Sequence, residues 1–165
     1  MMEAHLVKVG MADLKVTNDA FGVLKTMGLG SCVGIAIYDR QKKIAGLAHV
    51  MLPHSGIMRH QVMNVAKYAD TAIPEMIGQM VALGASVARM EAKIAGGAQM
   101  FQFITQSESM KIGSRNIEMC KEMLLRFRIN VVAEDTGGNY GRTVEFANAT
   151  GIMTIRTALN GVKEL

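Results

Sequence analysis

The sequence predicts an α+β fold, a layered α/β sandwich with mostly antiparallel strands and two main helices. Short apolar or alternating runs occupy both ends of the chain, and two longer segments between them carry apolar residues at helical spacing. Because strands dominate both ends, a doubly wound parallel sheet is not expected. The chain has 165 residues and shows neither an internal repeat nor a linker, so residues 1–165 are expected to form a single domain.

The first third of the chain is expected to be strands. The pattern predicts strands at 5–9, 13–16, 21–27, 33–38 and 43–50. The last two are predicted to form a hairpin that closes through residues 39–42. Loops of two or four residues both place Cys32 opposite His49 on one face of the ladder, whereas a three-residue loop puts them on opposite faces. This turn has no Asn-Gly or Asp-Gly pair to fix its length.

The rest of the chain alternates helices with shorter strands. Apolar spacing predicts a helix over 67–83, in which Pro74 must lie in the first turn or produce a kink, and a second helix over 114–127 with Ser114 as its N-cap. Strands are predicted at 89–95, 129–133, 142–147 and 152–157, the last two forming a closing hairpin. Residues 54–64 and 101–110 are predicted to be loops.

Composition narrows the function classes. Hydrophobic residues make up 50% of the chain and there is no Trp among them, so the core must rely on aliphatic residues and on the 15 methionines. Some of these methionines would alternatively offer a docking surface for a helical partner. The net charge of +4 is scattered, which argues against nucleic acid as a partner. No apolar stretch approaches the ~20 residues of a membrane span. A cytoplasmic protein without membrane insertion is expected.

One cysteine stands at a position suited to nucleophilic chemistry. Cys32 ends the glycine-rich stretch Thr26–Cys32, directly before an apolar strand, and His49 lies on the next strand. A thiol paired with an imidazole is what a cysteine nucleophile and its base require. The turn offers backbone N–H groups near Gly30 and Ser31 for an oxyanion, and Thr26 can orient the imidazole. A buried cysteine beside a structural histidine is the alternative, and the residues alone leave it open.

Other motifs carry less chemistry. Asp135–Gly137 matches the tripeptide of aspartic proteases, but that chemistry needs two such carboxylates and the chain has one copy. The spacing of His49, His54 and His60 fits no standard zinc site, and Gly96-Gly97 lacks the frame of a phosphate loop, so neither a metal nor another cofactor is expected. Cys120, on the apolar face of the second predicted helix, is expected to be a buried hydrophobe.

Several stretches together resemble the CheD family, the bacterial chemoreceptor glutamine deamidases. They follow the family's order over most of the chain: Gly28–Cys32, Ala48–Pro53, Lys67–Ala72, Lys93–Ala98, Gly113–Asn116 and Glu134–Asn139. The resemblance implies a catalytic trio of Cys32 as nucleophile, His49 as base and acid, and Thr26 as the group that orients His49. It also implies an α/β sandwich related to the catalytic domains of cytotoxic necrotizing factor toxins.

The expected function is therefore that of a cysteine amidohydrolase, a protein-glutamine glutaminase acting on the cytoplasmic helices of methyl-accepting chemoreceptors. Esterase activity on methylated glutamates is a possible extension, since it uses the same chemistry. The resemblance further implies binding to CheC, a phosphatase, in adaptation. Residues expected to contact substrate or partner are Gly96, Gly97, Phe101, Gly137 and Gly138. Two alternatives stay open: a mainly non-catalytic partner of CheC and receptors, and a redox-sensing thiol with a second cysteine nearby.

Overall fold

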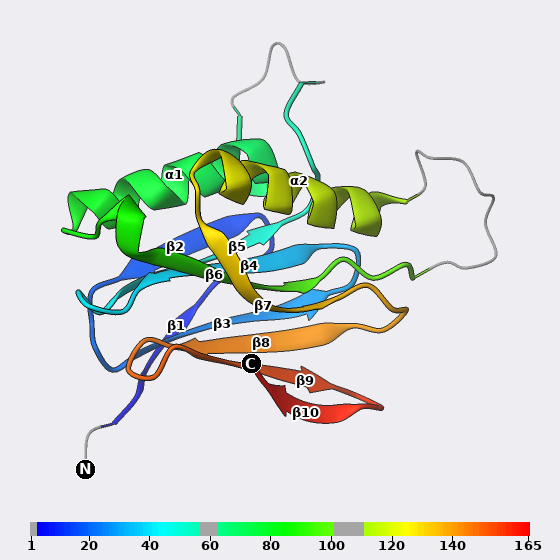
Figure 1. Ribbon diagram of the computed structural model, residues 1–165. Helices are drawn as coiled ribbons and strands as arrows, with labels where there is room; N and C mark the ends of the chain where they lie inside the picture. The colour runs from blue at the N-terminus through cyan, green and yellow to red at the C-terminus, as the bar shows by residue number, and fades with distance from the viewer. Residues whose placement is uncertain (1–2, 57–62, 101–110) are drawn as a thin grey trace.

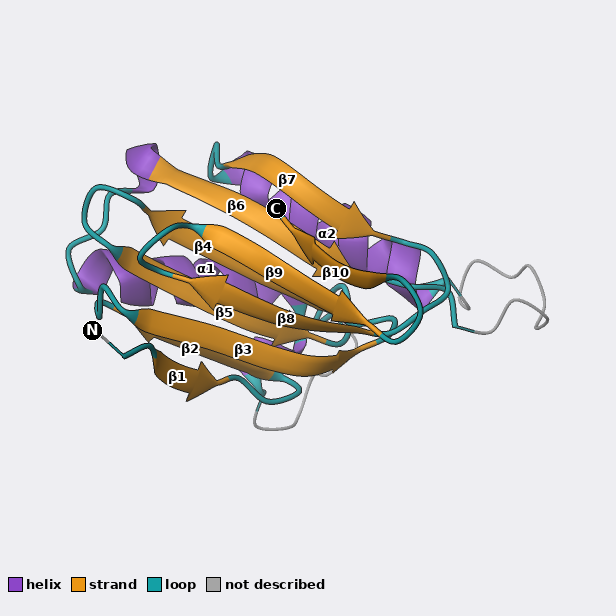
Figure 2. Cartoon of the chain, turned by 90° about the horizontal axis from the view of Figure 1, so that it is seen from below, coloured by secondary structure: helices purple, strands orange, loops and turns teal. Residues whose placement is uncertain are grey.

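The computed structural model describes residues 3–56, 63–100 and 111–165, and these form three layers (Figure 1). Two α-helices cover one face of a five-stranded sheet, and a second five-stranded sheet packs against its other face. Figure 2 views the molecule from the side of the second sheet, with the helices behind. The predicted α+β sandwich with two main helices is confirmed. Loop 101–110 and most of loop 54–64 lie outside the described residues.

Each sheet combines early and late segments of the chain. The helix-covered sheet has the order β2 (Asp13–Thr17), β5 (Ile44–Val50), β4 (Val33–Asp39), β6 (Met90–Gly96) and β7 (Asn130–Thr136). The second sheet has the order β1 (His5–Lys8), β3 (Gly22–Leu29), β8 (Arg142–Ala147), β9 (Ile152–Thr157) and β10 (Gly161–Glu164). Pairing is antiparallel except for β1 with β3 and β6 with β7, which are parallel.

The central strands β4 and β5 are buried along their whole length, because both of their faces are covered. Val33, Ile35 and Ile37 pack in the layer under the helices, whereas Ala36 and Tyr38 pack between the two sheets. This period of two assigns every residue of the strand to one layer or the other. Cys32 belongs to the layer between the sheets, and so the chemistry predicted for it lies there.

The helices are α1 (Ala69–Ala82) and α2 (Ile112–Arg126), and short 3-10 turns occur at Val65–Lys67 and Val87–Arg89. Among the described residues, no helix is long and apolar enough to cross a membrane. Buried methionines fill the layer beneath the helices, as predicted from composition; they include Met76, Met80, Met90 and Met123. Pro74 lies inside α1 beyond its first turn, so the first-turn placement is wrong and one backbone hydrogen bond of the helix is missing.

The predicted hairpin forms with a different register. Its loop contains four residues, 40–43, and Asp39 pairs with Ile44, so His49 lies opposite Gly34 instead of Cys32. Two features move the loop by one residue. Asp39 is held by Arg89 and by the backbone of Ser86, and Lys43 adopts a left-handed conformation with φ of 54°. The pairing changes by two positions, an even number, so Cys32 and His49 stay on the same face.

Two further predictions need correction. Helix α2 begins at Ile112, with Lys111 at the cap position and no side-chain cap bond, so Ser114 is not its N-cap. The first turn of the helix packs closely against the chain after β6, since a Cβ atom at Gly113 would lie 2.5 Å from the carbonyl oxygen of Ala98. Strand β10 was not predicted. All four of its residues are exposed, so it carries no alternating pattern to detect.

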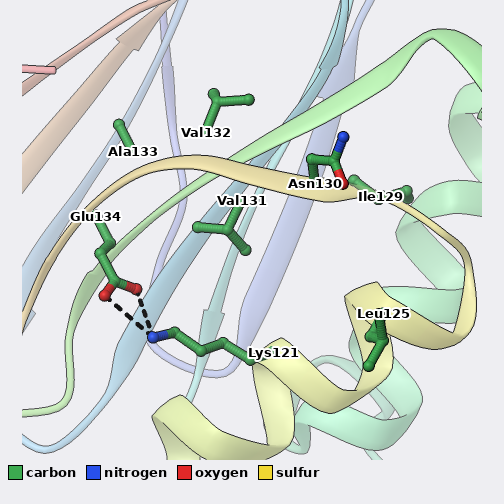
Figure 3. A pocket seen from close by; sticks show the side chains of 8 residues that line it. All are labelled: Lys121, Leu125, Ile129, Asn130, Val131, Val132, Ala133 and Glu134. Atoms are coloured by element: carbon green, nitrogen blue, oxygen red, sulfur yellow. Dashed lines mark hydrogen bonds and ion pairs between the residues drawn. The ribbon is translucent and has the colours of Figure 1, made fainter.

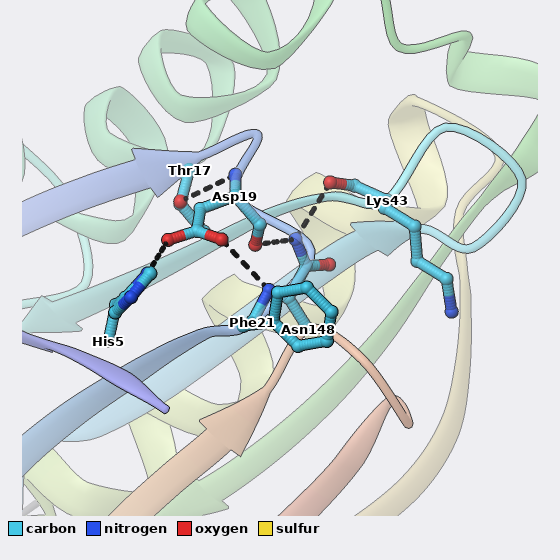
Figure 4. A network of polar contacts seen from close by, with 6 residues as sticks. All are labelled: His5, Thr17, Asp19, Phe21, Lys43 and Asn148. Atoms are coloured by element: carbon cyan, nitrogen blue, oxygen red, sulfur yellow. Dashed lines mark hydrogen bonds and ion pairs between the residues drawn. The ribbon is translucent and has the colours of Figure 1, made fainter. Parts of the chain in front are cut away.

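A polar network closes the end of the sandwich opposite Cys32 (Figure 4). Buried Asn148 donates from Nδ2 to the carbonyl oxygens of Asp19 and Lys43, at 2.8 and 2.7 Å. The Asp19 carboxylate accepts from the Phe21 N–H and pairs with His5. One amide group thereby joins the turn before β3, the β4–β5 loop and the β8–β9 turn.

Candidate active site

Thr26 and His49 meet across the gap between the two sheets. Thr26 lies on β3 and His49 on β5, and Thr26 Oγ1 is 2.7 Å from His49 Nδ1. Both residues are buried, with exposures of 1% and 0%. A hydrogen bond at Nδ1 fixes the ring's orientation and leaves Nε2 for another task. No described residue offers a hydrogen bond to the buried Nε2.

Cys32 lies on the same face as His49, one residue before β4 begins. Gly34, directly opposite His49, has no side chain to compete for the space beside the imidazole. Cys32 is two positions further along the ladder, a diagonal neighbour of His49. The structure therefore brings Cys32, His49 and Thr26 to one end of the layer between the sheets.

Burial controls the protonation of both reactive groups. It raises the pKa of the Cys32 thiol above its ordinary value of 9.0, an effect opposed by its own backbone N–H. It also lowers the pKa of His49 below 6.5, since the charged imidazolium is poorly solvated there. At neutral pH the resting site holds a thiol and a neutral imidazole. A neutral imidazole is the form that can act as a base toward the thiol.

The segment that carries Cys32 is held by a second glycine turn. The Gly97 N–H donates to the Cys32 carbonyl and the Ala98 N–H donates to the Gly30 carbonyl, both at 2.8 Å. A side chain at Gly96, whose φ is +111°, would lie 2.3 Å from the Cys32 carbonyl oxygen. Gly96 and Gly97 therefore have a clear structural role. Their backbones fix the position of the cysteine.

A third turn lies beside these two. The Gly137 N–H donates to the Gly96 carbonyl, and the Gln99 N–H donates to the Gly138 carbonyl, each at 2.9 Å. The four glycines singled out in the sequence, Gly96, Gly97, Gly137 and Gly138, thus gather at the end of the sandwich that holds Cys32. Phe101, the fifth residue of that group, lies outside the described residues. Contact of these residues with a substrate or partner remains a prediction.

Two buried polar residues at this end had not been singled out individually. Asn116, on α2, donates from Nδ2 to the carbonyl oxygens of Ser31 and Met51. Arg142, on β8, is 2% exposed. Its Nη2 lies 3.6 Å from Asp135 Oδ1, and its guanidinium group lies over the ring of Tyr140. The stretch Gly113–Asn116 was already noted as a family match, which was the available signal for Asn116. A charged residue in a strand pattern gave no comparable signal for Arg142.

The competing chemistries find less support. Cys120 is fully buried beneath the helices, on the other side of the sheet from Cys32, and both thiols are free. This confirms Cys120 as a buried hydrophobe and weakens the redox-pair alternative. Asp135 forms ion pairs with Arg142 and Lys163, as a structural carboxylate does. Among the described residues, no cluster of three metal-binding side chains occurs. His60 lies outside the described residues.

A pocket of about 550 Å³ lies elsewhere, between α2 and β7 (Figure 3). It is lined by Lys121 and Leu125 of the helix, by Ile129, and by residues 130–134 of the strand. Lys121 Nζ lies 2.8 Å from Glu134 Oε2, so the two charges at its edge compensate each other. None of the predicted catalytic residues contributes to this pocket.

Comparison with known proteins decides the family. A family model described as CheD chemotactic sensory transduction matches residues 51–157. The chain belongs to the CheD family. A probable chemoreceptor glutamine deamidase CheD from Geobacillus kaustophilus is 51% identical over 166 residues, which cover 100% of both chains. The matched model begins after Thr26, Cys32 and His49, whereas the full-length similarity to this CheD protein covers their positions.

Other CheD proteins are similar over nearly their whole length. The chemoreceptor glutamine deamidase CheD of Halalkalibacterium halodurans is 48% identical, covering 97% of this chain and 98% of that protein. The Bacillus subtilis protein of the same name is 44% identical, covering 99% and 98%. Among solved structures, the Bacillus licheniformis hypothetical protein YfiH matches 83% of this chain and 61% of its own, with a TM-score of 0.50 and 14% identity. That likeness concerns the fold alone.

Proposed function

We propose that this chain is a chemoreceptor glutamine deamidase, a cysteine amidohydrolase that converts glutamine side chains of receptor cytoplasmic helices to glutamate. The observation that carries the proposal is the 2.7 Å hydrogen bond between Thr26 Oγ1 and His49 Nδ1, with Cys32 on the same face of the ladder. A thiol, an imidazole and a group that orients the imidazole form the minimal set for cysteine-based acyl transfer. Membership in a family whose members are named glutamine deamidases supplies the substrate class.

The first half of the reaction forms a thioester. His49 Nε2 takes the proton of the Cys32 thiol as Sγ attacks the amide carbon of the glutamine side chain. The resulting oxyanion is stabilised by backbone N–H groups of the glycine-rich turn, including those of Ser31 and Cys32. The imidazolium then gives its proton to the amide nitrogen, which leaves as ammonia. Because both resting groups are neutral, proton transfer accompanies the attack and needs no preformed thiolate.

The second half releases glutamate. His49 removes a proton from water, whose oxygen attacks the thioester carbon, and the thiolate of Cys32 leaves and is reprotonated. Each cycle consumes one water, releases one ammonia and replaces a neutral amide with a carboxylate. A receptor helix thereby gains one negative charge at each modified position. The same tetrahedral chemistry extends to methyl esters of glutamate, where methanol replaces ammonia as the leaving group.

Mass spectrometry of a receptor cytoplasmic fragment tests this function. Incubation with the wild-type protein should add about one mass unit at specific glutamines, the mass difference between an amide and a carboxylic acid. Cys32→Ala should abolish the gain, whereas Cys120→Ala serves as the matched control because that thiol is buried beneath the helices. Unchanged receptor peptides with wild type, or an undiminished gain with Cys32→Ala, would reject the proposal.

Binding to CheC is the second part of the proposal, and it rests on the family resemblance. The Cys32→Ala variant separates this role from catalysis because the substitution removes only a sulfur atom from a buried position. If regulation through CheC dominates, this variant keeps both its affinity for CheC and its effect on adaptation in cells. If deamidation dominates, the adaptation defect of Cys32→Ala matches that of a deletion while CheC binding persists.

A further inference from the structure

Asn116 connects the two arms of the candidate site. Its side chain is completely buried at the start of α2, and Nδ2 donates to the carbonyl oxygen of Ser31 at 2.9 Å and to that of Met51 at 3.0 Å. Ser31 precedes Cys32, and Met51 follows His49 by two residues. A single amide group therefore holds the backbone beside the thiol to the backbone beside the imidazole.

These two carbonyls lie beyond the end of the β4–β5 ladder. Strand β4 begins at Val33 and β5 ends at Val50, so strand pairing no longer satisfies the residues past those limits. The Met51 N–H is bound to the carbonyl of Lys67. Asn116 thus supplies the link between the two arms where the ladder itself has stopped. Buried carbonyl groups without a partner would otherwise destabilise this end of the sheet.

The same bond sets the direction of the Cys32 N–H. Every peptide bond in the described ranges is trans, so the N–H of Cys32 points away from the carbonyl of Ser31, and hence away from Asn116. The neighbouring carbonyls of Gly30 and Cys32 are fixed by Ala98 and Gly97. No other described residue accepts a hydrogen bond from the Cys32 N–H. These bonds hold the N–H in place, and within the described ranges it has no partner other than its own sulfur.

We propose that Asn116 is a positioning residue of the deamidation reaction, which orients the Ser31–Cys32 peptide so that the Cys32 N–H meets the oxyanion of the substrate. The inference rests on the proposed function. It assigns a task to the Gly113–Asn116 stretch, which the Cys-His-Thr trio leaves unexplained. Asn116 touches neither the substrate nor the reacting atoms, and it acts through the backbone of the nucleophile.

The chain contains a matched control in Asn148. This residue is also buried, at 5% exposure, and its Nδ2 also donates to two main-chain carbonyls, at the opposite end of the sandwich. Substitution by alanine removes the same set of bonds at each position. Asn116→Ala and Asn148→Ala should therefore lower thermal stability to a similar extent. Only the first should affect the reaction.

The kinetic experiment compares receptor-fragment deamidation with alkylation of Cys32 by iodoacetamide. Loss of one oxyanion donor lowers kcat by about 100- to 1,000-fold, and misorientation of the donor should lower it by roughly 10- to 100-fold. Asn116→Ala should show this loss of kcat with KM within about twofold. Alkylation should change by less than about threefold, because it develops no charge on a carbonyl oxygen. Asn148→Ala should leave all three values unchanged.

Three kinetic results would overturn the inference: an unchanged kcat in Asn116→Ala, equal losses of kcat and alkylation rate, or a comparable kcat loss in Asn148→Ala. If Asn116→Ala does not fold, Asn116→Leu decides, because leucine has a similar size and donates no hydrogen bond. Asn116→Leu should then lower kcat by roughly 10- to 100-fold, and a wild-type kcat in it would reject the role.

A readout without substrate separates this inference from the proposed function. The chain has two cysteines, so a sample labelled with [15N]cysteine gives two amide signals. Asn116→Ala should shift or broaden the Cys32 signal, and Asn148→Ala should not. An unmoved Cys32 signal would refute the positioning role even if the protein is a deamidase. If the Cys32 signal shifts but the wild-type protein has no deamidase activity, the proposed function is wrong, whereas the link between Asn116 and the Cys32 N–H stands.

Discussion

At the scale of single residues, the proposed site consists of three side chains drawn from different parts of the fold. Thr26 belongs to the second sheet, His49 to the helix-covered sheet, and Cys32 to the turn that enters it. The hydrogen bond between Thr26 and His49 therefore also joins the two sheets. Burial favours the neutral forms of the cysteine and the histidine, and Nε2 is the nitrogen that has no partner among the described residues.

Thr26→Val should reduce kcat for receptor deamidation by roughly 10- to 100-fold. Valine keeps the shape but removes the partner of Nδ1, and a hydrogen bond to a charged imidazolium contributes about 1.5–3 kcal/mol. Steady-state kinetics of the variant measures the effect. Thr26→Ser retains the hydroxyl and is the control, expected within a few-fold of wild type. Equal rates for Thr26→Val and wild type would show that Thr26 does not support the base.

The rate of Cys32 alkylation should depend on pH through His49. Because burial lowers the pKa of His49 below 6.5, the imidazole stays neutral at neutral pH and assists deprotonation of the thiol. Alkylation in wild type should fall only as pH drops below about 6.5. In His49→Gln the thiol reacts alone, and its raised pKa shifts reactivity above pH 9.0. Peptide mass spectrometry quantifies both profiles, and superimposable profiles would argue against coupling between the two groups.

At the scale of elements, the site is made where three turns converge. The turn before β4 carries the Cys32 thiol. The turn after β6 donates hydrogen bonds to the main-chain carbonyls of the cysteine turn, and the turn after β7 donates one, from Gly137, to the turn after β6. Hairpin β4–β5 then sets which residues face the gap between the sheets. Substitutions in these turns are therefore expected to affect both stability and the proposed reaction.

Gly96→Ala should be markedly more destabilising than Gly137→Ala. Both glycines have positive φ, for which an alanine costs about 1–2 kcal/mol. Only at Gly96 would the added Cβ also meet the backbone of Cys32, whereas nothing lies within 4 Å at Gly137. Chemical denaturation measures the difference in unfolding free energy. Equal losses would mean that the contact between Gly96 and Cys32 relaxes without cost.

Asp39→Asn should lower the free energy of unfolding by about 2 kcal/mol. Burial acts to raise the pKa of Asp39, but hydrogen bonds from Arg89, Ser86 and Lys42 outweigh it and hold the pKa below 3.8. The carboxylate therefore contributes stability that is complete above the unfolded pKa and is lost as pH falls through the folded one. Urea unfolding at pH 7 and at pH 3 checks both statements.

Glu122→Gln is the control for Asp39→Asn, because its ion pair with Arg126 is exposed on α2. It should cost less than about 0.5 kcal/mol. A similar small loss in Asp39→Asn would show that the contact of Asp39 with Arg89 does not stabilise the hairpin, and the explanation given for the register would lose its basis.

At the scale of the whole molecule, sequence patterns predicted the fold class and, within the described ranges, both α-helices and nine of the ten strands. They could not place the hairpin loop, because its position depends on contacts of Asp39 with Ser86 and Arg89, residues distant in sequence. They also could not show that Thr26 reaches His49 from the opposite sheet, since sheet stacking leaves no local signature. The face shared by Cys32 and His49 was predictable because side-chain alternation tolerates even shifts.

The central claim is that Cys32 attacks the glutamine side chain, and the most direct test is the mass of the enzyme during turnover. Wild-type protein mixed with a receptor fragment should be quenched in acid within the first turnover, digested, and analysed at the Cys32 peptide. The account predicts an adduct on Cys32 whose mass equals that of the receptor peptide minus one ammonia. The Cys32→Ala variant should show no such adduct and should form no glutamate. Glutamate formation by Cys32→Ala at the wild-type rate, with Cys32 unmodified in wild type, would contradict it.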